Sequence, residues 1–141
     1  LKNANSFYLK SPRSKRLWTY MGDVCSFYEK LVEKIVSGEN WLIGSVLHVA
    51  GNKNDVVLEN IQLANLIKTL TGSDMEIIEG EYEPGEIVNG KPITFYIDAS
   101  LTRNLLNWRP KWSIEEGLKR TIDWFRRNIF RYSVVSYYKS L

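Results

Sequence analysis

Short β-prone runs alternate with capped amphipathic helices along this chain of 141 residues. Four runs have the composition of strands, and they lie at residues 16–21, 45–49, 75–78 and 93–97. Four helices are expected to open at Asp23, Asn60, Asp98 and Ser113. Such alternation indicates an α/β or α+β class. Because the strands are few and short, and a complete doubly wound sheet would need more of them, we expect part of a larger fold.

The first helix has the clearest pattern. After Asp23, its expected N-cap, apolar side chains recur at spacings of three and four as far as Gly38: Val24, Phe27, Tyr28, Leu31, Val32, Ile35 and Val36. Asn60 is the expected cap of a second helix that ends at Gly72.

The C-terminal third predicts two helices separated by a break. Asp98 opens a helix as far as about Leu106, and Trp108-Arg109-Pro110 interrupts the pattern. Ser113 and Glu116 form a capping box. The following helix is expected to turn five residues inward: Ile114, Leu118, Thr121, Ile122 and Phe125. Between residues 79 and 90 the chain is acidic and rich in turn signals, which predicts an exposed loop.

Composition excludes several classes of protein. The longest apolar stretches are far below the roughly 20 residues that span a bilayer, so no membrane association is expected. One cysteine, Cys25, and one histidine, His48, cannot supply a disulfide or a zinc site of the usual kind. The lone Cys25 is read as a packing residue, and the reducing compartment it fits leads us to expect a cytoplasmic protein. A net charge of +3 is too small to demand a nucleic-acid partner.

Four segments carry a more specific signal, and they occur in this order: Arg16-Leu17-Trp18-Thr19-Tyr20-Met21-Gly22-Asp23, Val46-Leu47-His48-Val49-Ala50-Gly51, Asn60-Ile61-Gln62-Leu63-Ala64, and residues 98–125. The last segment is the most distinctive, with an Asp-capped helix, a Leu-Leu-x-Trp-x-Pro turn and a Glu-Gly-Leu helix ending in Trp124-Phe125. Together they resemble the extended short-chain dehydrogenases/reductases that act on nucleotide sugars, the NAD-dependent epimerases and 4,6-dehydratases.

The resemblance implies the C-terminal, substrate-binding lobe of such an enzyme, with the Rossmann half missing. Residues 1–12 would be an irregular lead-in, 13–128 the nucleotide-sugar-binding region, and 129–141 a tail of unassigned structure. The chain has no glycine-rich dinucleotide loop and no Tyr followed four residues later by Lys. We therefore expect no catalytic, cofactor-binding or metal-binding residue here, although NAD or NADP is implied for the parent enzyme. The resemblance also allows a homodimer.

Two residues are candidates for substrate binding. By resemblance, Arg16 would contact the diphosphate of a nucleotide sugar, a role that suits the planar fork and permanent charge of a guanidinium. The alternative is a solvated arginine in a basic run with Arg13 and Lys15. His48 stands where the family often has Asn near the substrate and would donate to a phosphate or sugar oxygen. The alternative is a partly buried strand histidine with a backbone partner.

Glu83 departs from the family pattern. Many relatives place an arginine just before this Pro-Gly as a second phosphate clamp, whereas a glutamate would repel phosphate. Either another basic residue substitutes, or the chain binds its substrate differently. Asp23 and Asp98 are expected to be structural. The tryptophans Trp108, Trp112 and Trp124 are expected to pack between elements, with base stacking as the alternative.

Three hypotheses follow. The first is an enzyme fragment that leaves an apolar surface exposed where the missing half would sit. The second is a stand-alone module whose basic ends meet an acidic partner or nucleic acid. The third is one subunit of a split enzyme whose partner carries the Rossmann half.

Overall fold

The computed structural model describes residues 5–51 and 57–128. This part contains four α-helices and one 3-10 helix: α1 (Met21–Val36), η1 (Asn40–Leu42), α2 (Asn60–Thr71), α3 (Ser100–Leu106) and α4 (Ile114–Asn128). Its strands are β1 (Ser6–Leu9), β2 (Lys15–Arg16), β3 (Leu58–Glu59), β4 (Glu76–Glu79), β5 (Ile87–Val88), β6 (Lys91–Pro92) and β7 (Thr94–Phe95). The α/β class with four helices and few short strands is therefore confirmed.

The strands form three small sheets. β1 pairs in parallel with β4, and β5 and β6 form an antiparallel hairpin. β2 lies between β3, to which it is antiparallel, and β7, to which it is parallel. The residues of β2 are Lys15 and Arg16, so both belong to the middle strand of this sheet.

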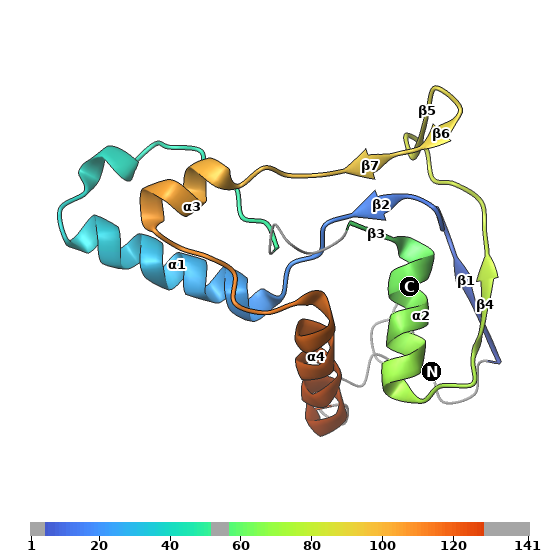
Figure 1. Cartoon of the computed structure of the whole chain (residues 1–141). Helices are drawn as coiled ribbons and strands as arrows, with labels where there is room; N and C mark the ends of the chain where they lie inside the picture. Colours follow the sequence, from blue (N-terminus) through green and yellow to red (C-terminus); the bar gives the residue numbers. More distant parts are fainter. Residues whose placement is uncertain (1–4, 52–56, 129–141) are drawn as a thin grey trace, which may run out of the picture.

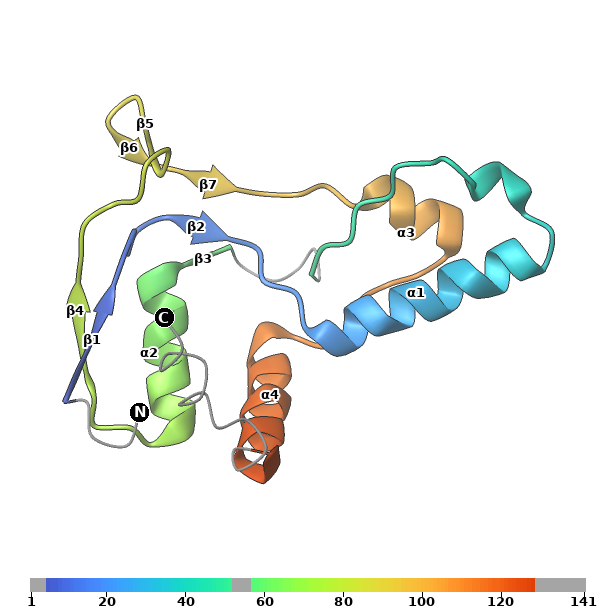
Figure 2. The ribbon, with the colours of Figure 1, turned by 180° about the vertical axis from the view of Figure 1, so that it is seen from behind.

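The molecule is elongated, as two opposite views show (Figures 1 and 2). Helices α1 and α3 lie together at one end, and β1, β4 and α2 lie at the other. The strands β2 and β7 run between the two ends, and α4 lies beside α2 near the start of α1.

The core lies at the α1–α3 end and is small. Phe27, Leu42, Leu106 and Trp108 are buried together, and four side chains pack partly against them: Leu31, Ile35, Leu47 and Val49. The rings of Phe27 and Trp108 meet edge to face, 5.7 Å apart. The indole N–H of Trp108 donates to the Ser26 hydroxyl over 2.9 Å, which satisfies its one buried donor. The prediction that Trp108 packs in the core is confirmed.

Asp23 is structural, but it is not the N-cap that the sequence predicted. Helix α1 begins at Met21, after Tyr20, and no side chain caps it. Asp23 is only 2% exposed, and its carboxylate accepts the backbone N–H groups of Lys111 (2.8 Å) and Trp112 (3.3 Å). It therefore fastens the start of α1 to the connection between α3 and α4.

The predicted capping box of α4 and the predicted end of α2 are confirmed, whereas the predicted cap at Asn60 is wrong. Ser113 and Glu116 form the capping box at the start of α4, with the Ser113 hydroxyl 2.7 Å from the Glu116 carboxylate. Gly72 ends α2 in the left-handed conformation, with φ of 66°. Helix α2 is preceded by Glu59 rather than capped by Asn60, whose side-chain amide instead donates to the carbonyl of Ser11 over 3.0 Å.

The strands predicted at 75–78 and 93–97 are confirmed as β4 and β7, whereas the other strand predictions are wrong. Residues 6–9 were expected to be irregular, but they form β1. A strand was predicted at residues 16–21, whereas the strand in the structure, β2, contains only residues 15–16. Residues 45–50 form no strand. A strand exists only where another strand pairs with it, and the described part of the chain offers no ladder partner to residues 45–50.

The apolar face of α1 is divided by the structure. Phe27, Leu31 and Ile35 face the core. A second row along the helix stays exposed, and it consists of Met21 (67%), Cys25, Tyr28 (59%), Val32 (57%) and Val36 (81%). The expectations that Cys25 and Trp124 are packing residues and that Phe125 turns inward are wrong, since all three side chains are exposed.

Candidate functional site

Arg16 is the last residue of β2, and its side chain is largely covered by neighbours. One terminal nitrogen donates to the carbonyl of Lys15 over 3.0 Å, and the other donates to Glu86 Oε1 over 2.5 Å. The guanidinium carbon also lies 5.9 Å from the centre of the Phe95 ring, on the neighbouring strand β7. The Arg16 side chain is therefore fixed by contacts with its neighbours and is not a solvated arginine.

The backbone places Glu86 at the base of the β5–β6 hairpin. Its N–H donates to the carbonyl of Glu83, and its own carbonyl accepts the N–H of Ile93, both over 3.0 Å. The tip of the hairpin is Asn89-Gly90, with φ of 51° and 73°, the pair favoured in two-residue turns. The loop predicted at residues 79–90 is present, and it places the Glu86 carboxylate beside Arg16.

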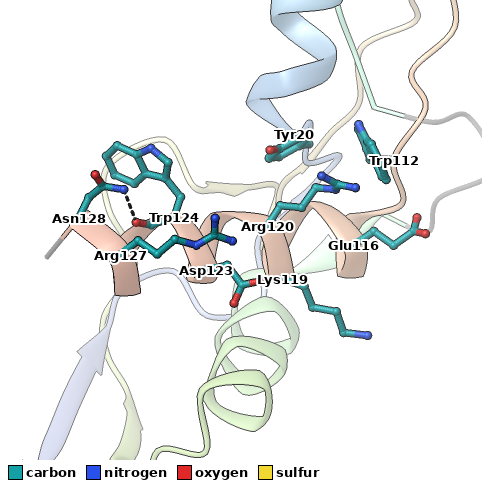
Figure 3. Close-up of a pocket in the computed structure, with 9 residues that line it drawn as sticks. All are labelled: Tyr20, Trp112, Glu116, Lys119, Arg120, Asp123, Trp124, Arg127 and Asn128. Atoms are coloured by element: carbon teal, nitrogen blue, oxygen red, sulfur yellow. Dashed lines mark hydrogen bonds between the residues drawn. The ribbon is translucent and has the colours of Figure 1, made fainter.

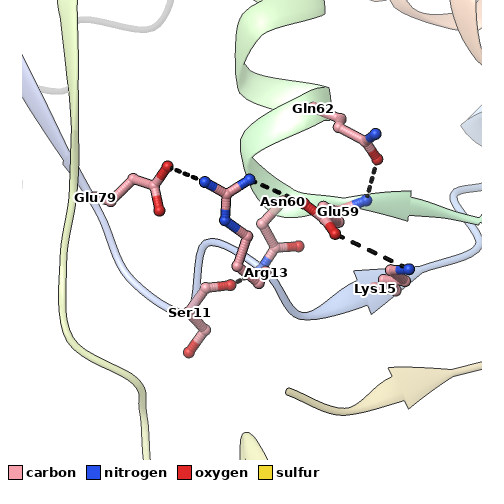
Figure 4. Close-up of polar contacts among 7 residues, drawn as sticks. All are labelled: Ser11, Arg13, Lys15, Glu59, Asn60, Gln62 and Glu79. Carbon is pink, nitrogen blue, oxygen red and sulfur yellow. Dashed lines mark hydrogen bonds and ion pairs between the residues drawn. The ribbon is translucent and has the colours of Figure 1, made fainter. Parts of the chain in front are cut away.

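The other cations of the basic run are also paired (Figure 4). Arg13 contacts Glu59 at 3.2 Å and Glu79 at 2.6 Å, and Lys15 Nζ lies 3.9 Å from Glu59. The hydrogen bond with Glu59 and the charge of Glu79 raise the pKa of Arg13. These pairs join β2, the β3–α2 junction and β4, so Arg13 and Lys15 act as structural cations here.

Glu83 pairs with an exposed lysine. Lys10 Nζ lies 2.6 Å from the Glu83 carboxylate, and this hydrogen bond raises the pKa of Lys10. The position before Pro84-Gly85 therefore offers no cation to a phosphate, and its carboxylate neutralises one nearby.

His48 lies in the extended segment 45–50, and its side chain is exposed. The partly buried strand histidine considered as the alternative is therefore wrong. The hydrogen bonds from Ser100, with a smaller effect from the charge of Arg103, lower the pKa of the nearby Asp98. Asp98 accepts the N–H of Ser100 over 2.8 Å, which supports a structural role, but the prediction that Asp98 opens the helix is wrong because α3 begins at Ser100, after Ala99. No hydrogen bond or ion pair between described residues joins His48 to Arg16.

A separate cavity of about 540 Å³ lies along α4 and reaches Tyr20 and Trp112 (Figure 3). The Arg120 guanidinium lies 3.5 Å from the centre of the Trp112 ring, and Lys111 Nζ lies 4.9 Å from it. The Tyr20 ring meets Trp112 edge to face at 6.4 Å. Because these contacts already occupy the indole, a nucleobase would have to displace a cation before it could stack there.

The described residues do not fit a dinucleotide. A pyrophosphate is held by the N–H groups at the N-terminus of a helix, where a glycine-rich loop allows close approach. Each long helix here carries carboxylates at that end, namely Asp23 in α1, Glu59 before α2, and Glu115 and Glu116 in α4. Among residues 5–51 and 57–128, no three His, Cys, Asp or Glu side chains gather in a way that could hold a metal ion. Nor is any helix in that part long and apolar enough to cross a bilayer.

Glu86 was not predicted from the sequence as a partner of Arg16, although the distribution of charge indicated that acidic and basic segments would pair. Residues 74–98 carry most of the chain's acidic excess, and residues 1–20 carry five basic residues and no acid. Complementary charge in two segments indicates that they will meet in the fold, but it does not say which carboxylate meets which cation.

Comparison with known proteins places these features in context. No protein-family model matches the chain. It is 31% identical, over 84 residues, to a UDP-glucuronate 4-epimerase from Thermodesulfobacterium geofontis, which corresponds to 60% of this chain and 24% of that protein. It is 25% identical, over 118 residues, to a dTDP-glucose 4,6-dehydratase from Xanthomonas campestris pv. campestris, covering 80% of this chain and 31% of that protein. The chain thus spans between a quarter and a third of the length of these relatives.

Two solved structures share its fold. The UDP-glucose 4-epimerase of Thermotoga maritima with UDP-glucose aligns with a TM-score of 0.64 and 23% identity, over 88% of this chain and 36% of that one. The dTDP-glucose 4,6-dehydratase of Bacillus anthracis in complex with NAD aligns with a TM-score of 0.61 and 24% identity, over 88% of this chain and 35% of that one.

Proposed function

The chain matches a portion of the extended short-chain dehydrogenase/reductase family of epimerases and dehydratases, and from this assignment we propose that it is the nucleotide-sugar-binding lobe of an NAD- or NADP-dependent enzyme. In this proposal the dinucleotide and the catalytic groups belong to a companion half, on the same chain or on another. The lobe contributes Arg16 to the diphosphate and His48 to the substrate pocket.

The exposed apolar row on α1 is the observation that carries the proposal. Its five members, Met21, Cys25, Tyr28, Val32 and Val36, recur at spacings of three and four along one face of the helix. A contiguous apolar face of this kind is usual where a monomer meets another protein surface. The matched segments make up only 24% and 31% of the two relatives, so a companion of the right origin exists in their architecture.

The extended segment 45–50 supports the same proposal. It contains the β-prone residues Val46, Val49 and Leu47, yet it pairs with no strand in the described part of the chain. A companion that presents a strand edge beside it would supply the missing backbone hydrogen bonds.

The chemistry at Arg16 supports binding of a diphosphate. An arginine held at a strand end by a backbone carbonyl and beside an aromatic ring presents its charged fork in a defined direction. Two of the similar proteins are described by names that contain UDP- or dTDP-linked sugars, which suggests the same class of ligand here.

Calorimetry tests the proposal. UDP-glucose and dTDP-glucose would be titrated into this chain alone. They would then be titrated into the chain assembled with the part of the Thermodesulfobacterium geofontis relative that has no counterpart in it. We expect weak binding alone and tighter binding in the assembly, with NAD bound only by the assembly. If neither preparation binds any nucleotide sugar, the proposal is wrong. Salt-dependent binding of DNA or RNA without sugar-nucleotide binding would instead favour a stand-alone module.

A further inference from the structure

The ion pair between Arg16 and Glu86 differs from every other ion pair of the basic run. The side chains of Arg16 and Glu86 are 27% and 18% exposed, whereas Lys10, Arg13 and Lys15 are each 45% exposed or more. A pair that is shielded from water is weakened less by solvent and salt than an exposed one. Glu86 therefore neutralises Arg16 more effectively than the neighbouring acids neutralise their partners.

The two terminal nitrogens of Arg16 are both engaged. One donates to Lys15 O and the other to Glu86 Oε1. A phosphate binds arginine through the same fork of N–H groups that a carboxylate uses. The side of the fork that faces Glu86 is therefore open to an incoming diphosphate only after the carboxylate leaves.

The carboxylate of Glu86 is itself only half satisfied. Its Oε2 is buried and has no hydrogen-bond partner among the described residues. Leaving a buried carboxylate oxygen without a donor costs free energy, which offsets part of what the ion pair contributes. The contact is consequently a displaceable one. The backbone of Glu86 is fixed by hydrogen bonds with Glu83 and Ile93, so rotation of the side chain is enough to release Arg16.

We propose that Glu86 is a built-in competitor for the anion that Arg16 binds, so that a nucleotide sugar binds by displacing the Glu86 carboxylate from the guanidinium. This inference rests on the proposed function. It makes Glu86 a specificity-determining residue, because a diphosphate with several charged oxygens can replace a carboxylate, whereas a weakly charged ligand cannot.

The test is titration of UDP-glucose and dTDP-glucose into the full 141-residue chain and its variants, with circular dichroism as the check on folding. Glu86→Gln removes the competing charge and keeps the shape of the side chain. We expect it to bind roughly tenfold more tightly than the unmodified chain, the scale of one charge-assisted hydrogen bond. Glu76→Gln is the matched control, since Glu76 is an exposed acid of β4 with no proposed role in binding. We expect it to change affinity by no more than about twofold.

A double variant shows whether the gain passes through Arg16. Adding Arg16→Ala to Glu86→Gln should abolish the tighter binding. If that double variant binds as tightly as Glu86→Gln alone, the inference is overturned. It is also overturned if Glu86→Gln binds equally or more weakly than the unmodified chain, because Glu86 would then merely orient Arg16, and the proposed function would survive. If no variant binds either ligand, both the inference and the binding of sugar nucleotides by this chain are wrong.

Discussion

At the scale of single residues, Asp23 shows how a buried charge can be structural without being a cap. Its carboxylate is surrounded by backbone donors from a segment almost 90 positions away in sequence. No local pattern reports such a partner. The sequence therefore predicted the structural role of Asp23, from its place at the start of a helix, and assigned the wrong contact.

Replacing Asp23 tests that contact. Asp23→Ala removes both acceptors and leaves the N–H groups of Lys111 and Trp112 without their partner, which should lower the free energy of unfolding by about 1–3 kcal/mol. Urea denaturation followed by circular dichroism measures the change. Asp74→Ala is the matched control because Asp74 is exposed, and its effect should stay within about 0.5 kcal/mol. Equal effects of the two substitutions would contradict the role assigned to Asp23.

Arg16 marks the limit of prediction at this scale. Its place on a strand was predicted from the neighbouring residues, and the resemblance to the enzyme family adds the prediction, so far untested, that it binds a diphosphate. Its partner Glu86 lies 70 positions away, and the pairing depends on how the hairpin and β7 return to β2. A long-range ion pair of this kind follows from the three-dimensional path of the chain, which sequence spacing does not encode.

At the scale of elements, the helices were predicted better than the strands. A capping box such as Ser113 with Glu116, or a glycine such as Gly72, acts within one turn, so local sequence is enough to find it. A strand requires a distant partner. The run at 45–49 has the composition of a strand and still remains unpaired, while the unremarkable residues 6–9 form one because β4 lies beside them.

The capping box of α4 makes stability depend on pH. The hydrogen bonds from Ser113, with smaller contributions from Arg120 and Lys119, lower the pKa of Glu116 from its ordinary 4.5. A carboxyl group with a lower pKa in the folded state stabilises that state above the unfolded pKa, and the contribution is lost as pH falls through the folded value. The unmodified chain should therefore exceed Glu116→Gln in urea midpoint near neutral pH, and this difference should shrink between about pH 6 and about pH 3.

Glu76→Gln provides the comparison for this titration. Glu76 is an exposed residue of β4, outside any helix end, and its replacement should leave the pH profile parallel to that of the unmodified chain. A difference between the unmodified chain and Glu116→Gln that stays constant across the same pH range would contradict the assignment.

At the scale of the whole molecule, the chain has a small core and a large apolar exterior. Among residues 5–51 and 57–128, the buried cluster consists of Phe27, Leu42, Leu106 and Trp108, whereas many large apolar side chains are exposed. The overall composition is ordinary for a globular protein, so it did not predict the small core or the exposed apolar surface. The hypothesis of a missing half did predict an exposed apolar surface, and the row on α1 agrees with it.

Val32→Glu tests whether that row is a contact surface. Val32 is 57% exposed, so the substitution should change the free energy of unfolding of the isolated chain by no more than about 0.5 kcal/mol. It should nevertheless weaken assembly with the companion half, because a charge would be buried in an apolar contact. Analytical ultracentrifugation measures the assembly. Val88→Glu, at the similarly exposed hairpin, should leave assembly unchanged.

The single cysteine gives an independent readout of the same surface. Cys25 lies within the row and is exposed, so a maleimide should label it readily in the isolated chain. Labelling should become several-fold slower once the companion half is bound. An unchanged rate in an assembly that does form would place the contact elsewhere.

The strand pairings also bear on how the chain reaches this fold. Ser6 lies opposite Glu76, and Lys15 lies opposite Thr94, so both sheets join residues from early and late in the sequence. Pairings of such high contact order are slow to form, because a long loop must close before any hydrogen bond is gained. During synthesis, β2 cannot pair with β7 until residue 94 has emerged. Helix α1 also gains its tertiary contacts late, because Asp23 binds the backbone of Lys111 and Phe27 packs against Trp108.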